Sequence, residues 1–535
     1  MSQNRKTNEP CVFVTDDGRH AASLYQMQPP LEPADLVFNV DQLAGSGFDT
    51  FFYGAALEGG VVMYDSQVAP VWGDNVEMWT HPVWYRASRN IKQLIRDGHD
   101  PLKLLVERAH EKGIWFFCSN WVNFCGSRRE ESAGLGRASD WVYDHPQYEV
   151  GEEDDPRAAQ LSAKRFSFLH EEARQKRFVI HEEYLSRYET DGVDLDLCSF
   201  APFCRFDEAD KLAPLMTAWI SDLRKVADKA QQAQGRRKLI YARIPAHPGA
   251  WRALGYDVET WVKQKLVDGL LVLAGGPEAG VDHHHDVSAA VQLAQGSDCR
   301  VLSGMSMMVG GQQHQYATPS MMYAAAANAY AQGADGFGFS DAHLSPRGWP
   351  WADADYGAIR LLGQADLLAT ADKHYHARAG GRTLTDWTPG VAPRLPRTLV
   401  EGQTIDVELY VSDDLAHWDQ RGRVESVKLS VRVTSIEASL NELRVELNGR
   451  RLGDDLLDLN DLGYRLYGKG AIGPYGYIYE FDLPAEFFPK CGMNMIAVTL
   501  IKRDHQISGP FDLFAVDLQI NYRLHRHFRG QPLSY

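Results

Sequence analysis

The feature that most constrains this chain is a regular alternation of short apolar runs with amphipathic helical patterns, from residue 11 to about residue 378. The stretch "DPLKLLVERAHEKG" predicts a helix, with Asp100 as its N-cap, Pro101 in its first turn and Gly113 as its stop. The apolar run "IWFFCSNW" follows at once and predicts a strand. Strands without a polar face that alternate with helices are typical of a parallel sheet.

The number of these units predicts a closed sheet. We count eight strand–helix units, and eight consecutive units favour a (β/α)₈ TIM barrel. The alternative is an open doubly wound sheet, but no GxGxxG follows the first predicted strand, so the usual cofactor signature of that fold is missing. Three predicted strands begin with the same dipeptide, at Asp191-Gly192, Asp268-Gly269 and Asp335-Gly336, as expected where one helix–turn–strand unit is reused.

The composition changes near residue 380. The stretch "HARAGGRTLTDWTPGVAPRLP" is rich in Gly and Pro and predicts a linker, and segments such as "QTIDVELYVSD" and "FDLFAVDLQINYR" beyond it alternate apolar and polar residues. Such segments are typical of an antiparallel β-sandwich. The predicted fold class is α/β: a (β/α)₈ barrel at 1–378, a linker at 379–398 and an all-β accessory sandwich at 399–535.

Charge and cysteine content exclude several classes of partner. A formal net charge of -16 argues against a nucleic-acid partner and against an anionic membrane, because both would be repelled. No apolar run is long enough for a signal peptide or a membrane span. The seven cysteines are scattered without a CxxC pair, which favours reduced thiols and a cytoplasmic location. The sequence leaves the oligomeric state open, a homo-oligomer included.

Two aspartates occupy a predicted buried strand, "DGVDLDL". Because side chains alternate along a strand, Asp194 and Asp196 share one face. A carboxylate among the surrounding helices would cost several kcal/mol, so both are expected to face the barrel interior. Asp196 lies nearer the carboxyl end of the strand, where barrel enzymes place their active sites, whereas Asp194 alternatively forms a salt bridge inside the barrel. Asp191 precedes the strand and is expected to serve the turn before Gly192.

Four segments resemble a known group of enzymes: "DPLKLLVERAHEKGIWFFCSNW", "TDGVDLDLCSFAPF", "YARIPAHPGAWRALGYDVETWVKQKLVDGLLV" and "GADGFGFSDAHL". Together they are similar, in content and order, to the (β/α)₈ barrels called family 10-like glycosyl hydrolases, and the resemblance covers roughly residues 11–378. It implies a carbohydrate substrate without naming the sugar. The strand also resembles the DGxDxDxE strand of family 18 chitinases, but Cys198 occupies the position of their catalytic glutamate, which disfavours a chitinase-type mechanism.

Glycoside hydrolysis usually needs two carboxyl groups, roughly 5–9.5 Å apart. Asp196 is the first candidate, and the second is sought in Asp194, in Glu278 or Asp282 after the sixth strand, or in Asp341 after the eighth. We favour a pair from strands four and six, which would resemble the alpha-galactosidase type of barrel. No cofactor is expected. The stretch "DHHHD" (282–286) suggests a metal site, but consecutive histidines do not easily aim at one ion, so no bound metal is predicted.

Polar and aromatic residues gather where the predicted strands end. Arg243 is expected to pair with Asp194 or Asp196, or to grip a sugar hydroxyl or carboxylate. Trp79 lies in an aromatic loop after the second strand, which either stacks on a sugar or forms a small core of its own. The predicted substrate-binding residues are Asp17, His20, Tyr53, Glu58, Asn120, Trp121, Arg243, His343 and Trp79.

These features favour a glycoside hydrolase acting on an oligosaccharide or glycoside. One alternative is a lyase or isomerase of a sugar or uronate, in which Arg243 grips the substrate carboxylate. Another is a non-catalytic carbohydrate-binding barrel, which the lack of a glutamate on strands four and seven suggests.

Overall fold

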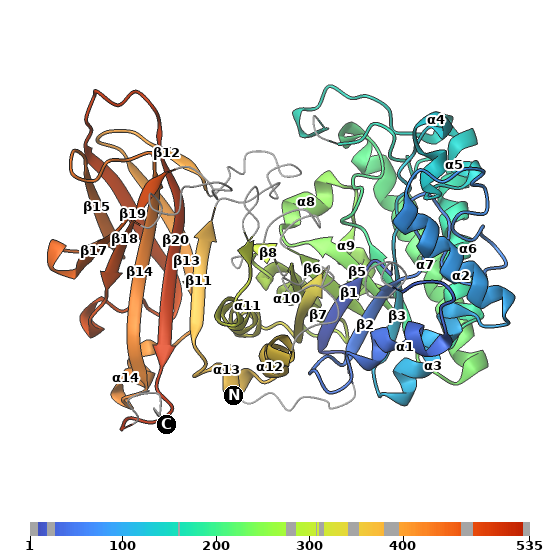
Figure 1. Cartoon of the computed structure of the whole chain (residues 1–535), viewed down its shortest axis with the longest axis horizontal. Helices are drawn as coiled ribbons and strands as arrows, with labels where there is room; N and C mark the ends of the chain where they lie inside the picture. Colours follow the sequence, from blue (N-terminus) through green and yellow to red (C-terminus); the bar gives the residue numbers. More distant parts are fainter. Residues whose placement is uncertain are drawn as a thin grey trace.

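The structure, a computed structural model, describes residues 9–18, 27–158, 161–273, 285–306, 308–309, 315–340, 353–378, 395–461 and 475–527. Figure 1 shows a barrel of parallel strands surrounded by helices and, beside it, a pair of antiparallel sheets. This arrangement confirms the predicted fold class, a TIM barrel followed by an antiparallel β-sandwich.

Eight parallel strands close the barrel in the order β1-β10-β7-β6-β5-β4-β3-β2. Because β1 pairs with both β2 and β10, the sheet has no open edge. A short hairpin of β8 (Met308–Val309) and β9 (Gln315–Tyr316) follows the seventh barrel strand. The barrel strands are β1 (Val12–Asp16), β2 (Thr50–Gly54), β3 (Trp115–Trp121), β4 (Gly192–Asp196), β5 (Leu239–Pro245), β6 (Gly269–Leu273), β7 (Arg300–Ser306) and β10 (Gly336–Ser340).

Helices cover the outside of the barrel (Figure 1). The predicted helix at 100–113 is α3, and the Asp100 carboxylate accepts a hydrogen bond from the Leu102 N–H at 3.1 Å, as expected of an N-cap. None of the helices that the structure describes is both long and apolar enough to cross a bilayer. The helices are α1 (Pro33–Asp41), α2 (Pro82–Arg96), α3 (Pro101–Glu111), α4 (Arg129–Ser132), α5 (Asp140–Asp144), α6 (Glu171–Ser186), α7 (Ala209–Gln234), α8 (Pro248–Ala253), α9 (Val258–Lys263), α10 (Ser288–Ala294), α11 (Pro319–Ala331), α12 (Asp353–Leu362) and α13 (Ala365–Leu368).

The middle of the barrel is filled by aromatic rings. Phe13 contacts Phe52 at 5.6 Å between ring centroids, Phe52 contacts Phe117 at 5.0 Å, and Phe117 contacts Tyr241 at 5.3 Å. All four side chains are fully buried. This apolar plug closes the interior, so the polar residues farther along the same strands lie above it, toward the carboxyl ends.

Four aspartates clamp the opposite, amino-terminal end of the barrel. Each aspartate immediately precedes β2, β4, β6 or β10 and contacts one residue of the barrel strand before it. The carboxylate accepts a hydrogen bond from the main-chain N–H of that residue, and the main-chain N–H of the aspartate donates to its carbonyl. The pairs are Asp49 with Val12 (3.1 Å), Asp191 with Phe116 (2.7 Å), Asp268 with Ile240 (2.8 Å) and Asp335 with Val301 (2.9 Å). Asp191 therefore serves the turn, as predicted. Contacts at this end of a barrel contribute to stability, because barrel active sites lie at the opposite end.

Replacing Asp191 with alanine should lower the free energy of unfolding by about 2–4 kcal/mol. Its buried carboxylate also contacts His110 and Arg236, each at 3.1 Å, and the Phe116 N–H would lose its acceptor. Urea denaturation measures the change. The control is Asp222→Ala, because Asp222 is exposed and pairs with the exposed Lys225 at 2.7 Å, so its removal should change little. Equal losses in both variants would contradict a specific clamp.

The sandwich consists of two antiparallel sheets. One has the order β11-β20-β14-β18-β17, with β12 also paired to β20, and the other has the order β13-β19-β15-β16. A short helix, α14 (Leu415–Gln420), follows β13. The strands are β11 (Lys373–Arg378), β12 (Arg397–Leu399), β13 (Thr404–Val411), β14 (Val424–Thr434), β15 (Glu442–Leu447), β16 (Arg450–Arg451), β17 (Leu457–Asn460), β18 (Gly476–Asp482), β19 (Gly492–Lys502) and β20 (Phe511–Tyr522).

The helical pattern of "YGAIRLLGQADLLATADKHY" (356–375) predicts one last helix through residue 375, and the structure differs there. Instead, α13 ends at Leu368 and β11 begins at Lys373. Tyr375 and Ala377 alternate into the sandwich core, which outweighs the local helical pattern. The buried Lys373 ammonium also donates to the Ala371 carbonyl at 2.9 Å and pairs with Asp413 at 3.3 Å.

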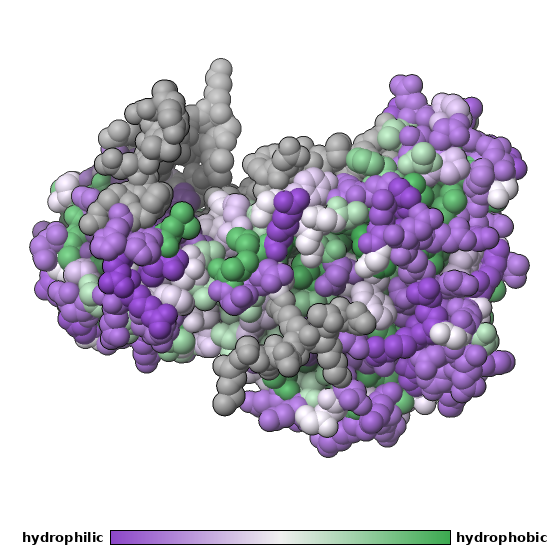
Figure 2. Space-filling model, turned by 90° about the horizontal axis from the view of Figure 1, so that it is seen from below, coloured by the Kyte–Doolittle hydropathy of each residue, from purple (hydrophilic) through white to green (hydrophobic). Residues whose placement is uncertain are grey.

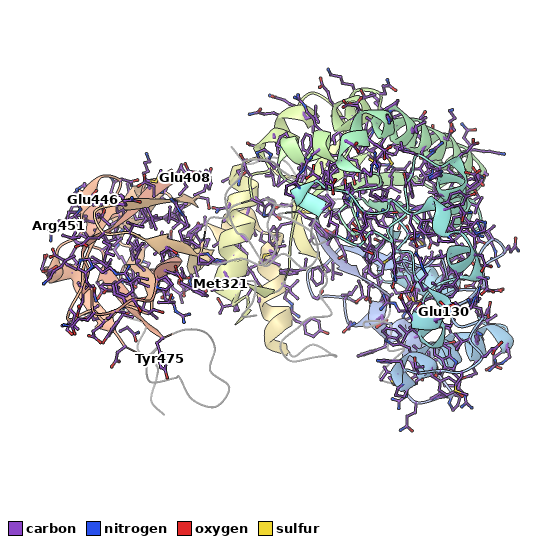
Figure 3. All side chains as sticks on the ribbon, turned by 90° about the horizontal axis from the view of Figure 1, so that it is seen from above. Glu130, Met321, Glu408, Glu446, Arg451 and Tyr475 are labelled. Atoms are coloured by element: carbon purple, nitrogen blue, oxygen red, sulfur yellow. The ribbon has the colours of Figure 1, made fainter. Side chains whose placement is uncertain are left out.

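Helix α11 contacts both domains. Figure 3 places Met321 of α11 between the barrel and the sandwich, and this side chain is fully buried. Ala324 of the same helix belongs to the sandwich core, and the Asn328 amide donates to the Tyr410 carbonyl at 3.1 Å.

Figure 2 shows that the face of the molecule seen there is mainly hydrophilic, with hydrophobic residues only in small patches.

Candidate active site

Three neighbouring strands bring polar side chains together above the aromatic plug. In the register of β3, β4 and β5, Asp194 pairs with Ser119 and Tyr241, and Asp196 pairs with Trp121 and Arg243, two residues farther toward the carboxyl ends. Asp194 contacts both Ser119 and Arg243, and Asp196 contacts Arg243. Both aspartates therefore lie on the inner face, which is the face expected from strand alternation.

Asp194 is fully buried beside one end of the Arg243 guanidinium. Its Oδ2 pairs with Arg243 Nη2 and accepts a hydrogen bond from the Ser119 hydroxyl at 2.7 Å, whereas its Oδ1 has no hydrogen-bond partner among the residues that the structure describes. Burial raises the pKa of Asp194, and this effect exceeds the lowering of that pKa by Arg243. The contacts of Asp194 are those of the internal salt bridge that the sequence left open as an alternative.

Asp196 is held by four hydrogen-bond donors. Its Oδ1 accepts the main-chain N–H groups of Cys198 (3.0 Å) and Ser199 (2.9 Å). Its Oδ2 accepts the Ser199 hydroxyl (2.7 Å) and Arg243 Nη1 (3.3 Å). The carboxylate is thus fixed in place as an acceptor and orders the start of the loop after β4.

Arg243 joins the two aspartates. Its Nη1 donates to Asp196, and its Nη2 donates to both Asp194 and Ser119, the latter at 3.2 Å. The sequence predicted a pair with one aspartate or the other, and the structure shows both. Because two carboxylates flank one guanidinium, Arg243 does not present an uncompensated positive charge to the solvent side.

A pocket opens above this cluster at the carboxyl end of the barrel. Its cavity volume is about 20 Å³, which is room for about one water molecule. Asp17, which follows β1, Trp121 of β3 and Asp196 of β4 all line it, and their roles toward a ligand stay predictions. Its described lining residues are Thr15, Asp16, Asp17, Gly54, Ala56, Ser119, Asn120, Trp121, Asp196 and Arg243.

Two predicted binding residues belong mainly to the outer face of the barrel sheet. The Tyr53 ring packs on Phe51 at 5.7 Å and on Phe116 at 5.8 Å, and its hydroxyl donates to the Gly18 carbonyl at 3.2 Å. Burial raises the pKa of Tyr53 well above its ordinary value, and nearby Asp16 and Asp17 raise that pKa further. Asn120 borders the pocket but is buried at 3% exposure.

Two others lie in the long loop after β2, outside the described pocket lining. Glu58 pairs with Arg137 at 2.5 Å, and the Arg137 guanidinium lies over the Trp84 ring. Trp79 packs against Tyr85 at 5.8 Å between ring centroids. These contacts are those of a loop with a small core of its own, the alternative to sugar stacking that the sequence left open.

Five predicted residues lie outside the residues that the structure describes: Glu278, Asp282, Asp341, His20 and His343. The second catalytic carboxyl group is therefore a prediction that the structure does not test. Within the described ranges, no group of three His, Cys, Asp or Glu side chains is arranged to hold a metal ion. His285, the described histidine of "DHHHD", is buried and contacts the Ser303 hydroxyl at 2.7 Å.

The sequence analysis missed the residues that shape one wall of the pocket. The Trp121 ring packs edge-on against Phe200 at 5.4 Å, and Phe200 has a φ of 55°, a left-handed conformation that costs about 1–2 kcal/mol for a non-glycine residue. The Asn123 amide donates to the Phe200 carbonyl at 2.8 Å, and the Val122 N–H donates to the Asp196 carbonyl at 3.2 Å. The ends of β3 and β4 are thereby tied together.

Arg177 of α6 supports this wall from behind. Its Nε donates to the Val122 carbonyl at 3.0 Å, its Nη2 donates to the Asn123 carbonyl at 3.4 Å, and its guanidinium lies 4.0 Å from the centre of the Phe124 ring. Burial lowers the pKa of Arg177 to about 10. A buried cation is costly, which favours a positioning role for Arg177.

We expect Arg177→Met to raise the KM of a substrate bound in this pocket about three- to ten-fold while kcat stays within about two-fold, because only the wall behind Trp121 is loosened. Steady-state kinetics separates the two constants. Arg174→Met is the matched control, since Arg174 lies on the same helix but donates to the Phe168 carbonyl. A similar KM increase in both variants, or a fall confined to kcat, would contradict this role.

Comparison with known proteins finds no matching protein-family model and no matching curated protein. Solved structures similar to this chain include alpha-L-fucosidase isoenzyme 2 from Paenibacillus thiaminolyticus, with 15% identity, a TM-score of 0.42, and coverage of 67% of this chain and 49% of that one. This chain thus spans about half the length of the fucosidase. The PgaB (BpsB) glycoside hydrolase domain from Bordetella bronchiseptica is 15% identical, with a TM-score of 0.39 over 66% of this chain and 98% of that domain.

A third similar structure is the maltogenic alpha-amylase AmyB from Thermotoga neapolitana, which is 9% identical, with a TM-score of 0.38 and coverage of 92% and 99% of the two chains. The names of all three describe enzymes that act on glycosides. At these TM-scores the similarity says nothing about activity. The narrower resemblance to family 10-like glycosyl hydrolases stays a prediction.

Proposed function

We propose that this protein is a glycoside hydrolase that acts on an oligosaccharide or glycoside. The observation that carries the proposal is the pocket at the carboxyl end of the barrel, which Asp17, Trp121, Asp196 and Arg243 line together. Barrel enzymes place their active sites at this end. Carboxylates suit sugar hydroxyl groups, and an aromatic ring suits the apolar face of a pyranose.

In this proposal Asp196 is the carboxylate that faces the anomeric carbon. Its oxygens accept hydrogen bonds from four donors. Asp196 is therefore better placed to act as the nucleophile, or to stabilise an oxocarbenium-like transition state, than to act as the proton donor. Asp194 holds Arg243, which in turn holds Asp196. A second carboxyl group donates the proton to the leaving oxygen, and Glu278, Asp282 and Asp341 remain its candidates.

The test is turnover of a panel of aryl glycosides and natural oligosaccharides by the full chain, with and without EDTA. We expect hydrolysis of at least one substrate at a rate that EDTA does not change. Loss of all activity in EDTA would instead favour a metal-dependent lyase or isomerase. Absence of turnover for every substrate, with the protein folded by circular dichroism, would contradict the proposal.

A second candidate is a carbohydrate-binding barrel without turnover. It is favoured by one observation: protein donors already occupy both oxygens of Asp196. This candidate predicts that calorimetry detects sugar binding while no bond is cleaved. Calorimetry on the same panel therefore distinguishes it from a glycosidase.

A further inference from the structure

An open groove lies on the outside of the barrel, between α5 and α6. Its cavity volume is about 420 Å³, within the range of about 300–1,000 Å³ that is usual for small-molecule sites. Figure 1 shows α5 and α6 on the side of the barrel that faces away from the sandwich. The groove and the barrel pocket have no described lining residue in common. Its described lining residues are Trp141 of α5 and Glu171, Glu172, Gln175, Lys176 and Val179 of α6.

The floor of the groove is an indole ring that other rings hold in place. Trp141 packs against Phe124 at 5.4 Å and against Phe166 at 5.6 Å between ring centroids. It also stacks on His145 at 5.0 Å. Both phenylalanines are fully buried, whereas Trp141 keeps part of its surface exposed. Because the ring is already ordered, a ligand that packs on it loses less entropy on binding.

One face of α6 forms the wall of the groove. Residues 171, 172, 175, 176 and 179 have the spacing of side chains that share one face of a helix. Among the residues that the structure describes, the side chains of Glu171, Glu172 and Gln175 make no hydrogen bond or ion pair. Their polar groups are therefore available to a ligand, and their methylene groups add apolar surface to the groove.

The mixture of charges in the groove favours a neutral ligand. The carboxylates of Glu171 and Glu172 would repel an anion. The Lys176 ammonium lies 6.0 Å from the centre of the Trp141 ring, where it would repel a second cation. A neutral pyranose fits these groups, because it has an apolar face of C–H groups and a rim of hydroxyl groups. The apolar face packs on an indole, and the hydroxyl groups both donate to carboxylates and accept from amide and ammonium groups.

We propose that this groove is a second carbohydrate-binding site, which binds a neutral pyranose unit of an oligosaccharide separately from the barrel pocket. Trp141 packs on the apolar face of the sugar, and Gln175 and the two glutamates form hydrogen bonds with its hydroxyl groups. The inference goes beyond the proposed function, because binding in the groove needs no catalytic residue and no reaction.

The test is binding of oligosaccharides to the full chain, which does not depend on turnover. Titration calorimetry in the cold compares four neutral hexasaccharides, maltohexaose, cellohexaose, xylohexaose and mannohexaose, with the anionic hexagalacturonate. We expect at least one neutral hexasaccharide to bind with a Kd below about 1 mM, and hexagalacturonate to bind at least about ten-fold more weakly. Raising the salt concentration from about 50 to about 500 mM should change the affinity for the neutral sugar less than about two-fold, because no ion pair holds it.

Two glutamine variants locate the binding. Gln175→Ala removes an exposed amide of the groove and should weaken binding of the neutral hexasaccharide about three- to ten-fold. Gln232→Ala removes an exposed amide of α7 outside the groove and should leave the affinity unchanged. Trp141→Ala should weaken binding at least about ten-fold. Since Trp141 also packs on buried rings, thermal melting monitors its folding, and Gln175→Ala decides the test if Trp141→Ala does not fold.

The outcomes separate this inference from the proposed function. Absence of binding for every neutral hexasaccharide, or equal affinity in the two glutamine variants, would overturn the inference even if glycosides are hydrolysed. Binding that depends on Gln175 in a protein without turnover would support the inference and contradict the proposed hydrolase. A wild-type dimer that Gln175→Ala dissociates in analytical ultracentrifugation would show that a second copy covers the groove, and it would also overturn the inference.

Discussion

Asp196→Asn is expected to lower kcat/KM for the best glycoside by at least about 1000-fold, as the loss of a nucleophilic or charge-stabilising carboxylate does in other enzymes. Asparagine has the same shape but no negative charge. Its carbonyl can still accept the Cys198 and Ser199 N–H groups, whereas its amide group would face Arg243 Nη1, a second donor. Kinetics on the substrate found in the panel measures the loss.

The control for this variant is Asp207→Asn, because Asp207 lies in the segment that follows the same strand but its side chain is 72% exposed and pairs with Arg205. It should retain full activity. Thermal melting and sugar binding show whether Asp196→Asn remains folded. An Asp196→Asn protein with wild-type turnover would contradict the assigned role, and wild-type binding without turnover would favour the non-catalytic barrel.

The barrel and the sandwich could be predicted because their signals are periodic and long. Eight repeats of an apolar run and a helix leave few topologies, and the alternation beyond residue 395 is a strand signal of another kind. The inward position of Asp194 and Asp196 followed from the period of two along β4. Each of these inferences uses only neighbours in the sequence.

Contacts between distant segments could not be predicted in the same way. Ser119 meets Asp194 only because β3 pairs with β4 in one register, and Arg177 supports the Trp121 wall from a helix more than fifty residues away. The contact between Ser199 and Asp196 could have been predicted, since an aspartate followed three residues later by serine is a pattern for side-chain capping of a turn.

The four aspartates at the amino-terminal end of the barrel were predictable from the sequence only in part. The Asp-Gly dipeptide occurs at three of the four positions, although a role in the turn was predicted for Asp191 alone; Asp49 is followed by Thr50 and was missed. The dipeptide was thus an incomplete marker, because the carboxylate makes the clamp and glycine only relieves local crowding. Gly192 illustrates that crowding: a Cβ there would lie 1.9 Å from the Leu239 carbonyl oxygen, and its φ is 149°.

The second prediction with a large effect concerns Arg243. Arg243→Met keeps much of the side-chain volume but leaves Asp194 and Asp196 buried without their shared cation. Breaking a buried ion pair by removing one partner is strongly destabilising, and we expect the free energy of unfolding to fall by about 3–5 kcal/mol in urea denaturation at neutral pH. Arg236→Met is the control, because Arg236 is 38% exposed and Asp191 keeps its other contacts; it should cost much less.

The pH dependence of this loss tests its cause. Burial already raises the pKa of Asp194, and removing Arg243 removes the main influence that lowers it. A carboxyl group whose pKa is higher in the folded than in the unfolded chain binds a proton on folding, so its contribution to stability is largest at low pH and is lost as the pH rises from about 3.9 through the folded value. The destabilisation by Arg243→Met should therefore be smaller at about pH 5 than at about pH 8. A loss that is equal at both pH values would mean that the missing contacts of the long side chain, and not the two unpaired carboxylates, destabilise the variant.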